Sequence, residues 1–260
     1  MNRTDLNQKL VVEFIGPFAL SFAGCAAIVL TGGENLVAIG LAHGLAIGLM
    51  IMAAGHISGG HFNPAVTVAM IATRRIDAAT GGLYIGAQLL GGLVGAFAVR
   101  LTTTESLRNA VQLGVPAVGA GHSNGSALLM EGILTFFLLF AIYGAAVDPR
   151  SSKSIAGLVI GLTITMDIYA GGAVSGAAMN PSRWFGAAVV QTQFDDFWIW
   201  IVGPIAGALA AAFLYNNVLL ANVSTSPAGG VPGNVQEVQV VTPSRPSGAA
   251  GAETRRRRNR

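Results

Sequence analysis

Two segments of the sequence carry the same combination of residues, an Asn followed by a Pro and a small residue. They are Asn63-Pro64-Ala65 and Asn180-Pro181-Ser182. Asn is a good helix N-cap and Pro is favoured at the first helical position, so each motif predicts a loop that leads directly into a helix. The side-chain amide of such an Asn can also offer an N–H donor to a polar molecule.

The helices predicted after these motifs are too short to cross a bilayer. Their apolar parts, residues 65–73 and 184–190, are far shorter than the roughly 20 residues that a transmembrane helix needs. Non-helical backbone at membrane depth is tolerated only where it is buried in protein or lines a wet cavity. We therefore interpret the two segments as half-helices that enter a membrane from opposite sides and form a pore.

The composition of the whole chain agrees with a membrane protein. Of 260 residues, 52% are hydrophobic and 10% are charged, whereas a soluble domain carries about 25% charged residues. The single cysteine, Cys25, cannot form an internal disulfide. Six apolar segments are predicted to span the membrane: residues 10–30, 36–54, 78–99, 127–147, 155–170 and 198–220.

The two halves of the chain repeat the same plan. Glu13 precedes Asn63 by 50 residues, and Glu131 precedes Asn180 by 49. Each half has three spans and one half-helix, and an odd number of spans requires the halves to insert with opposite orientations. The predicted fold is an all-α membrane protein with six transmembrane helices and two re-entrant half-helices in an inverted repeat. We expect both Glu side chains to face inward and to accept from backbone N–H groups of the re-entrant loops.

Charge placement predicts the topology. Basic residues fall on the side of both termini, so the positive-inside rule places both termini in the cytoplasm, with the plasma (inner) membrane as the expected location. The C-terminal segment is rich in Pro, Gly and Ser and ends in Arg residues, so we expect it to be disordered. The predicted parts are a lead (1–9), a channel domain (10–220, with a first repeat 10–100, a connection 101–126 and a second repeat 127–220) and a basic tail (221–260).

The sequence resembles the aquaporin (major intrinsic protein) family over essentially residues 11–220. The resemblance is carried by the two Asn-Pro motifs, by Arg183 three residues after the second Asn, and by Glu13 and Glu131. It implies a channel, not an enzyme, that is a homotetramer in the lipid bilayer with one pore per subunit for water and small neutral solutes. We expect no cofactor, no metal site and no nucleic-acid partner.

The same resemblance implies residues for the narrowest part of the pore. Counting from the two Asn residues places His43, Ile168, Ala177 and Arg183 at a selectivity constriction. This set is similar to that of the plant vacuolar (tonoplast) intrinsic type, which is wider and often passes ammonia with water. Protonation of His43 beside Arg183 would then reduce flux at acidic pH.

Further positions follow from the same counting. His56 is expected to brace the first loop together with Glu13, and Trp184 is left without a role because its bulk could either narrow the pore or pack against the bundle. The expected pore wall consists of Leu20, Val66, Leu138, Gly59, Gly60, His61, Gly176 and Ala178.

The expected function is a passive channel that conducts water, with ammonia as a further candidate solute, and that excludes protons and ions. One alternative is a facilitator mainly for ammonia, glycerol or other small neutral solutes. A second, from another class, is a membrane junction or structural protein with a poorly conducting pore. A third alternative is a coupled ion transporter, because Asp167 is an acid inside the fifth predicted span.

Overall fold

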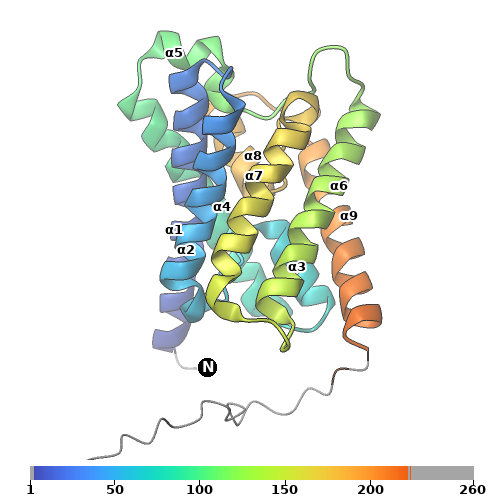
Figure 1. The fold of residues 1–260 in the computed structure, drawn as a ribbon. Helices are drawn as coiled ribbons and strands as arrows, with labels where there is room; N and C mark the ends of the chain where they lie inside the picture. Colours follow the sequence, from blue (N-terminus) through green and yellow to red (C-terminus); the bar gives the residue numbers. More distant parts are fainter. Residues whose placement is uncertain (1–2, 222, 224–260) are drawn as a thin grey trace, which may run out of the picture. The chain divides into compact units, whose positions relative to one another are not determined.

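The computed structural model describes residues 3–221 and 223. Within this part, six helices are long and apolar enough to cross a membrane. The N-terminal end of α1 and the C-terminal end of α9 lie on the same side, the lower one in Figure 1. The six spans are formed by α1 (Arg3–Thr31), α2 (Leu36–Ser58), α4 (Ala78–Thr102), α6 (Asn124–Ile142) with the turn that follows it, α7 (Ala156–Ser175) with the turn that precedes it, and α9 (Ile199–Leu214) with the turn that follows it. The predicted tail lies outside the described residues, apart from residues 221 and 223.

Two short helices complete the bundle. α3 (Pro64–Ala72) has 9 residues and α8 (Pro181–Gln191) has 11, and each begins with Pro directly after an Asn N-cap. α3 occupies the lower half of the bundle and α8 the upper half (Figure 1). The predicted fold class, six spanning helices and two half-helices in an inverted repeat, is confirmed.

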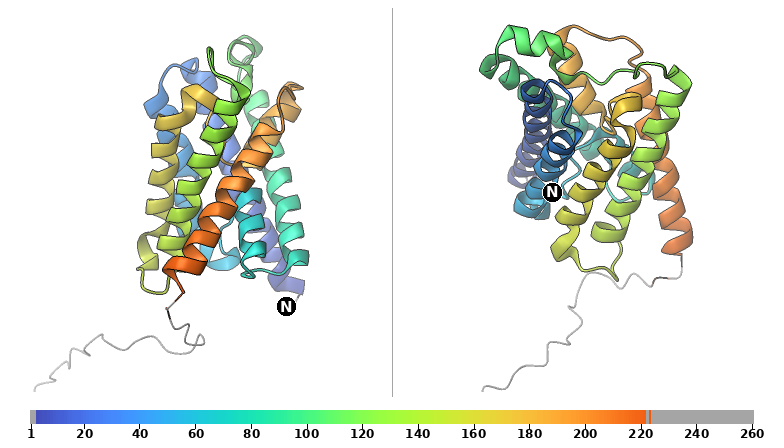
Figure 2. Two further views of the ribbon diagram at one scale, coloured as in Figure 1. Left: turned by 90° about the vertical axis from the view of Figure 1, so that its right-hand side faces the viewer. Right: turned by 45° about the horizontal axis from the view of Figure 1, so that its top comes forward.

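The helix contacts follow the symmetry of the repeat. The spanning helices pack in the order α4, α1, α2, α7, α6, α9, while α3 and α8 lie between α9 and α4. The pairing of α1 with α4 in the first half is matched by that of α6 with α9 in the second, and α2 meets α7 across the middle. The left view of Figure 2 shows α3 between α9 and α4.

Glycine allows α2 and α7 to approach very closely where they cross. A Cβ built on Gly44 would lie 2.3 Å from the carbonyl oxygen of Gly161, and one built on Gly157 would lie 2.5 Å from that of Gly48. Contacts this short leave no room for a methyl group, so any larger residue would push the helices apart. Small residues at helix crossings are typical of membrane bundles, in which packing drives association.

The helices on the lower side end in polar junctions. α6 and α9 each finish in a π-helical turn, Tyr143–Val147 and Tyr215–Leu219, and the short 3₁₀ helix Lys153–Ile155 precedes α7. On the upper side, the connection between the halves contains α5 (Glu105–Ala110) and the 3₁₀ turn Gln112–Gly114. The segment predicted as the connection between the repeats, residues 101–126, is therefore partly helical.

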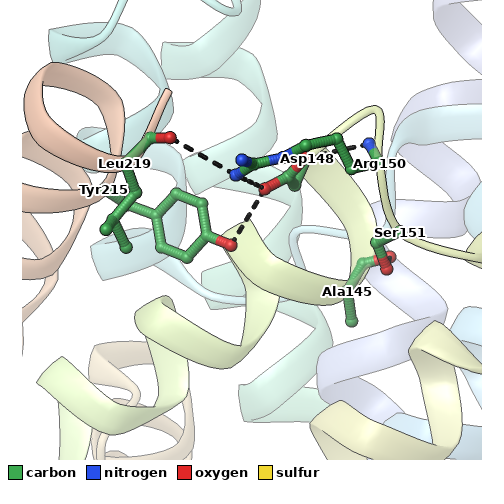
Figure 3. Close-up of polar contacts among 6 residues, drawn as sticks. All are labelled: Ala145, Asp148, Arg150, Ser151, Tyr215 and Leu219. Carbon is green, nitrogen blue, oxygen red and sulfur yellow. Dashed lines mark hydrogen bonds and ion pairs between the residues drawn. The ribbon is translucent and has the colours of Figure 1, made fainter. Parts of the chain in front are cut away.

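An ion pair within the α6–α7 connection, between Asp148 and Arg150, also makes hydrogen bonds with the turn that follows α9 (Figure 3). Asp148 Oδ1 accepts from Arg150 Nε at 2.9 Å, and Asp148 Oδ2 accepts from Arg150 Nη2 at 2.6 Å and from the Tyr215 hydroxyl at 3.1 Å. Arg150 Nη2 also donates to the Leu219 carbonyl at 3.3 Å. The hydrogen bonds and the charge of Arg150 hold the pKa of Asp148 well below its usual range.

We predict that Asp148→Asn lowers the thermal unfolding temperature of the purified protein at pH 7, because the amide cannot replace the charged acceptor. A carboxyl whose pKa is lowered by folding stabilises above the unfolded pKa and loses this contribution as pH falls through the folded pKa. The difference between wild type and variant should therefore be constant from about pH 7 to about pH 5 and shrink below about pH 4. Asp195→Asn, which removes an exposed carboxylate on the upper side, is the control. An equal decrease of the unfolding temperature in the two variants would contradict the prediction.

Candidate pore and its constriction

The first re-entrant loop is held by the buried carboxylate of Glu13. Its Oε1 accepts from the His61 backbone N–H at 3.0 Å and from the Ser58 hydroxyl at 2.6 Å. Its Oε2 accepts from the Phe62 backbone N–H at 2.8 Å and from the Gln88 amide Nε2 at 2.7 Å. An ionised carboxylate accepts such bonds strongly, so α1 supplies the partners that this non-helical backbone needs inside the bundle.

The second loop repeats this arrangement on Glu131 of α6. Glu131 Oε1 accepts from the Ser175 hydroxyl at 2.7 Å and from the Ala178 N–H at 2.9 Å, and Oε2 accepts from the Met179 N–H at 2.7 Å. Both carboxylates are fully buried. The structure thus places both Glu side chains at the loops, as the sequence predicted.

The loop backbones adopt conformations that direct their N–H groups to these acids. In the second loop, Gly176, Ala177 and Met179 have positive φ angles of 77°, 45° and 52°, and in the first loop Phe62 has a φ of 52°. Left-handed residues in a loop can turn neighbouring N–H groups to one side and so form a concave anion site. Positive φ is costly for residues other than glycine, and such strain persists only where the surroundings impose it.

A serine and an aromatic residue support each loop, and these were not predicted. Ser58 and Ser175 precede Asn63 and Asn180 by five residues each. The Tyr84 hydroxyl donates to the Ser58 carbonyl at 2.8 Å, and the Trp200 indole N–H donates to the Ser175 carbonyl at 2.9 Å. Both serines repeat at the same offset from their motifs, which is the signal that could have found them.

The two Asn residues cap their half-helices as predicted from the motifs. Asn63 Oδ1 accepts from the Ala65 N–H at 2.8 Å, and Asn180 Oδ1 accepts from the Ser182 N–H at 3.0 Å. Pro64 and Pro181 lie at the first helical position in each case.

The same Asn side chains join the two loops to one another. Asn63 Nδ2 donates to the Met179 carbonyl at 2.9 Å, and Asn180 Nδ2 donates to the Phe62 carbonyl at 2.9 Å. The N-termini of α3 and α8 therefore meet head to head. Each amide nitrogen carries two hydrogens, so each Asn keeps one N–H that these bonds do not use.

Both Asn side chains line a lumen in which the centres of water molecules have about 30 Å³ of space. Its wall is otherwise mainly aliphatic and contains Leu20, Val66 and Leu138. Gly60, His61 and Ala178 also line it. Among the described residues, the isoleucines of the wall are Ile47, Ile51, Ile142, Ile160, Ile164 and Ile168.

Further hollows adjoin the lumen on each side. The lower hollow shares Ile51 with the lumen, and the upper hollow shares His43 and Ile168 with it. Gly59 lines the lower hollow and Gly176 the upper one, so neither is among the residues that line the lumen itself, and their place in the pore wall stays a prediction.

His56 also lies at the lower entrance, on the last turn of α2, where its side chain is exposed. The expected bracing of the first loop by His56 is not seen. The side chains that contact Glu13 here are instead Ser58, at the end of α2, and Gln88 of α4.

The four residues expected at the constriction lie together near the upper end. His43, Ile168 and Ala177 line the lumen, while Arg183 lines the upper hollow and is buried. Arg183 Nε donates to His43 Nε2 at 3.3 Å, and His43 Nδ1 lies 2.8 Å from the Ile39 carbonyl.

These bonds assign the tautomer of His43. Arg is a donor only, so Nε2 must accept, and Nδ1 must carry the proton that it donates to the carbonyl. The ring is therefore neutral, and a second proton would occupy the site that Arg183 uses. The expected inhibition at acidic pH through His43 has no support in this arrangement.

Arg183 itself is fixed by a residue that the sequence did not single out. Its Nη1 donates to the Gly114 carbonyl at 2.9 Å, so the turn Gln112–Gly114 reaches over the lumen and holds the guanidinium from above. Gly114 has a φ of 72°, and a Cβ there would lie 2.7 Å from the Ile28 side chain. Nothing in the local sequence of the long connection indicates this long-range contact.

Two other residues left open by the sequence lie away from the lumen. Trp184 stacks on Trp200, with ring centroids 6.2 Å apart and an angle of 7°, in a buried cluster with Ala127, Ala188 and Ile199. Its bulk therefore packs against the bundle. Asp167 is buried, its carboxylate oxygens have no hydrogen-bond partner among the described residues, and it is not among the residues that line the described lumen. This position gives no support to a coupled ion pathway.

Comparison with known proteins decides the family. The family model described as "Major intrinsic protein" matches residues 1–215.

The chain belongs to the major intrinsic protein family.

Aquaporin NIP1-1 of Oryza sativa subsp. japonica is 37% identical over 219 residues, which cover 83% of this chain and 75% of that protein. Aquaporin TIP4-4 of Zea mays is 39% identical over 233 residues, which cover 85% of this chain and 90% of that protein. Since relatives with NIP and TIP names match similarly, the comparison does not single out the vacuolar type.

A solved structure agrees with this assignment. The aquaglyceroporin of Plasmodium falciparum matches with a TM-score of 0.76 and 25% identity, over 83% of this chain and 98% of that one. This major intrinsic protein is thus a multi-pass membrane channel and not an enzyme.

We predict that Glu131→Gln destabilises the second loop, because a Gln amide can present only one acceptor oxygen to the Ser175, Ala178 and Met179 donors. A buried donor left without an acceptor costs about 1–3 kcal/mol. Thermal unfolding of the purified protein measures the loss, and water flux in vesicles should fall with it. Glu34→Gln, at an exposed acid on the upper side, is the matched control. Unfolding temperatures that are equal for the two variants would contradict the role of Glu131.

Proposed function

We propose that this major intrinsic protein is a passive channel that conducts water, and ammonia with it, while excluding protons and ions. The proposal rests on one observation: each Asn side chain donates to the opposite loop and keeps a second N–H that this bond does not use, in a lumen whose wall is otherwise mainly aliphatic. A polar molecule in the lumen would find the two Asn amides as hydrogen-bond donors at the centre and few other polar side chains around them.

This arrangement supports water passage without proton passage. A water molecule that accepts from both Asn63 and Asn180 uses both of its lone pairs, so its own hydrogens point to its neighbours on either side. Those neighbours are then oriented in opposite directions. A proton could not hop along such a file, because no continuous chain of donors crosses the centre.

The head-to-head half-helices support the exclusion of cations. Each helix N-terminus carries the equivalent of about half a positive charge, so a cation at the centre would face about one charge of repulsion. At an effective dielectric constant of about 20 and a distance of about 4 Å, this repulsion is about 4 kcal/mol. A neutral solute does not meet this barrier.

The constriction supports a preference for small solutes that accept hydrogen bonds. Arg183 and its neighbour His43 form one side, and the aliphatic Ile168 and the small Ala177 contribute the rest. The guanidinium would repel ammonium and could donate to water or to the lone pair of ammonia. We propose these four residues as the selectivity constriction.

The charge of the two faces supports an orientation. The connections on the lower side (Figure 1), after α3 and between α6 and α7, carry Arg74, Arg75, Arg150 and Lys153, while those on the upper side carry Glu34, Glu105 with Arg108, and Asp195. By the positive-inside rule we propose that the lower side is cytoplasmic, in the plasma membrane, and that the protein assembles as a homotetramer with one pore in each subunit.

The proposal is tested with purified protein in liposomes. Osmotic shrinkage measures water flux, an internal pH dye measures ammonia and proton flux, and reswelling measures glycerol flux. We expect water and ammonia flux above that of empty vesicles, with glycerol and proton flux near background. Glycerol flux comparable with water would favour the alternative of a facilitator for small neutral solutes. Background flux for every solute would favour a junction or structural role.

Arg183→Val is predicted to admit urea and to allow some cation leak, because it removes both the bulk and the charge from the constriction. Val is the residue at the equivalent place in the first repeat, where Val66 lies three residues after Asn63. Arg183→Lys is the matched variant, since it keeps the charge without the planar fork of donors. It should exclude cations while admitting more urea than wild type. Wild-type urea and proton permeability in Arg183→Val would contradict this role.

A further inference from the structure

We propose that Gly24 of α1 is a specificity-determining residue of the channel. The absence of a side chain at this position allows the His43 ring to lie back from the lumen and to accept from Arg183. The inference rests on the proposed function, because it concerns the width and the donors of the same constriction.

The contact between Gly24 and His43 leaves no room for a methyl group. A Cβ built on Gly24 would lie 2.2 Å from His43 Nε2, 2.5 Å from Cε1 and 2.6 Å from Cδ2. Distances below 3.0 Å do not occur for real Cβ atoms, so one group would have to move. The nearest atom is Nε2, the one that accepts from Arg183.

Space, and not backbone conformation, explains glycine at this position. Gly24 lies within α1 and is not among the described residues with positive φ. Glycine in the interior of a helix is less favourable than Ala, so an ordinary helical position would gain from a side chain. What Gly24 provides is a flat surface against which the imidazole can lie.

Two hydrogen bonds fix the position of the His43 ring. Its Nδ1 donates to the Ile39 carbonyl, one turn earlier in α2, and its Nε2 accepts from Arg183. The ring lines the lumen, whereas Gly24 does not. The ring therefore lies between Gly24 and the lumen, and a side chain at position 24 would push it away from Arg183 and into the path of the solute.

The second repeat supplies an internal comparison. Gly24 follows Glu13 by eleven residues, and Ile142 follows Glu131 by eleven; His43 precedes Asn63 by twenty, and Ile160 precedes Asn180 by twenty. Ile142 and Ile160 both line the lower lumen. Where no imidazole has to be accommodated, a large side chain is present at the position equivalent to Gly24.

The experiment compares Gly24→Ala in two backgrounds, with His43 present and with His43→Ala, in liposomes of equal protein content. With His43 present, Gly24→Ala is expected to reduce water flux several-fold. With His43→Ala, which removes the ring, Gly24→Ala is expected to leave the flux of water and urea unchanged. Gly86→Ala, at an exposed α4 glycine whose Cβ would meet nothing within 4 Å, is the control and should behave as wild type.

Each outcome decides the inference. Wild-type flux in Gly24→Ala, or an equal reduction in both backgrounds, would overturn it, because the effect would then not act through the ring. If Gly24→Ala does not fold, folding of the double variant supports the inference and failure of both overturns it. Absence of water flux in the wild-type protein would instead be a failure of the proposed function, which this comparison reveals before any variant is measured.

Discussion

The channel depends on two buried carboxylates that gather the backbone N–H groups of the re-entrant loops. Half-helices that meet in the middle of a bundle leave several residues of loop with no helical hydrogen bonds, and lipid or an aliphatic wall cannot supply them. Glu13 of α1 and Glu131 of α6 supply acceptors for the N–H groups of these loops. Because their oxygens use the N–H groups, the Phe62 and Met179 carbonyls remain free to accept from the opposite Asn, and this exchange joins the two halves.

The scaffold is symmetric, but the side chains that it presents to the lumen are not. The acids, serines and Asn caps have equivalents in both repeats, whereas Arg183 corresponds to Val66 and His43 corresponds to Ile160. The upper part of the lumen consequently carries donors and a fixed charge, and the lower part is walled largely by isoleucine. An inverted repeat can thus keep one mechanical framework in both halves and place its selective constriction in only one of them.

Sequence alone predicted the fold class and much of the framework, because the signals are local. The Asn-Pro motifs set the half-helix starts, and the spacing to Glu13 and Glu131 exposed the repeat. Two partners from other helices and connections were not predicted. Gln88 joins Glu13 only because α4 packs on α1, and the Gly114 carbonyl reaches Arg183 only through the path of the long connection. His56 was misplaced because its proximity to the loop in sequence does not fix the direction of its side chain.

The most direct test of the account is an experimental structure of the protein in a lipid bilayer, at a resolution that shows ordered water. The account predicts a single file of water through the lumen, with a central molecule within hydrogen-bonding distance of Nδ2 of both Asn63 and Asn180. Loops that lie apart, or side chains that fill the space between the two Asn residues so that no water file crosses it, would contradict the account.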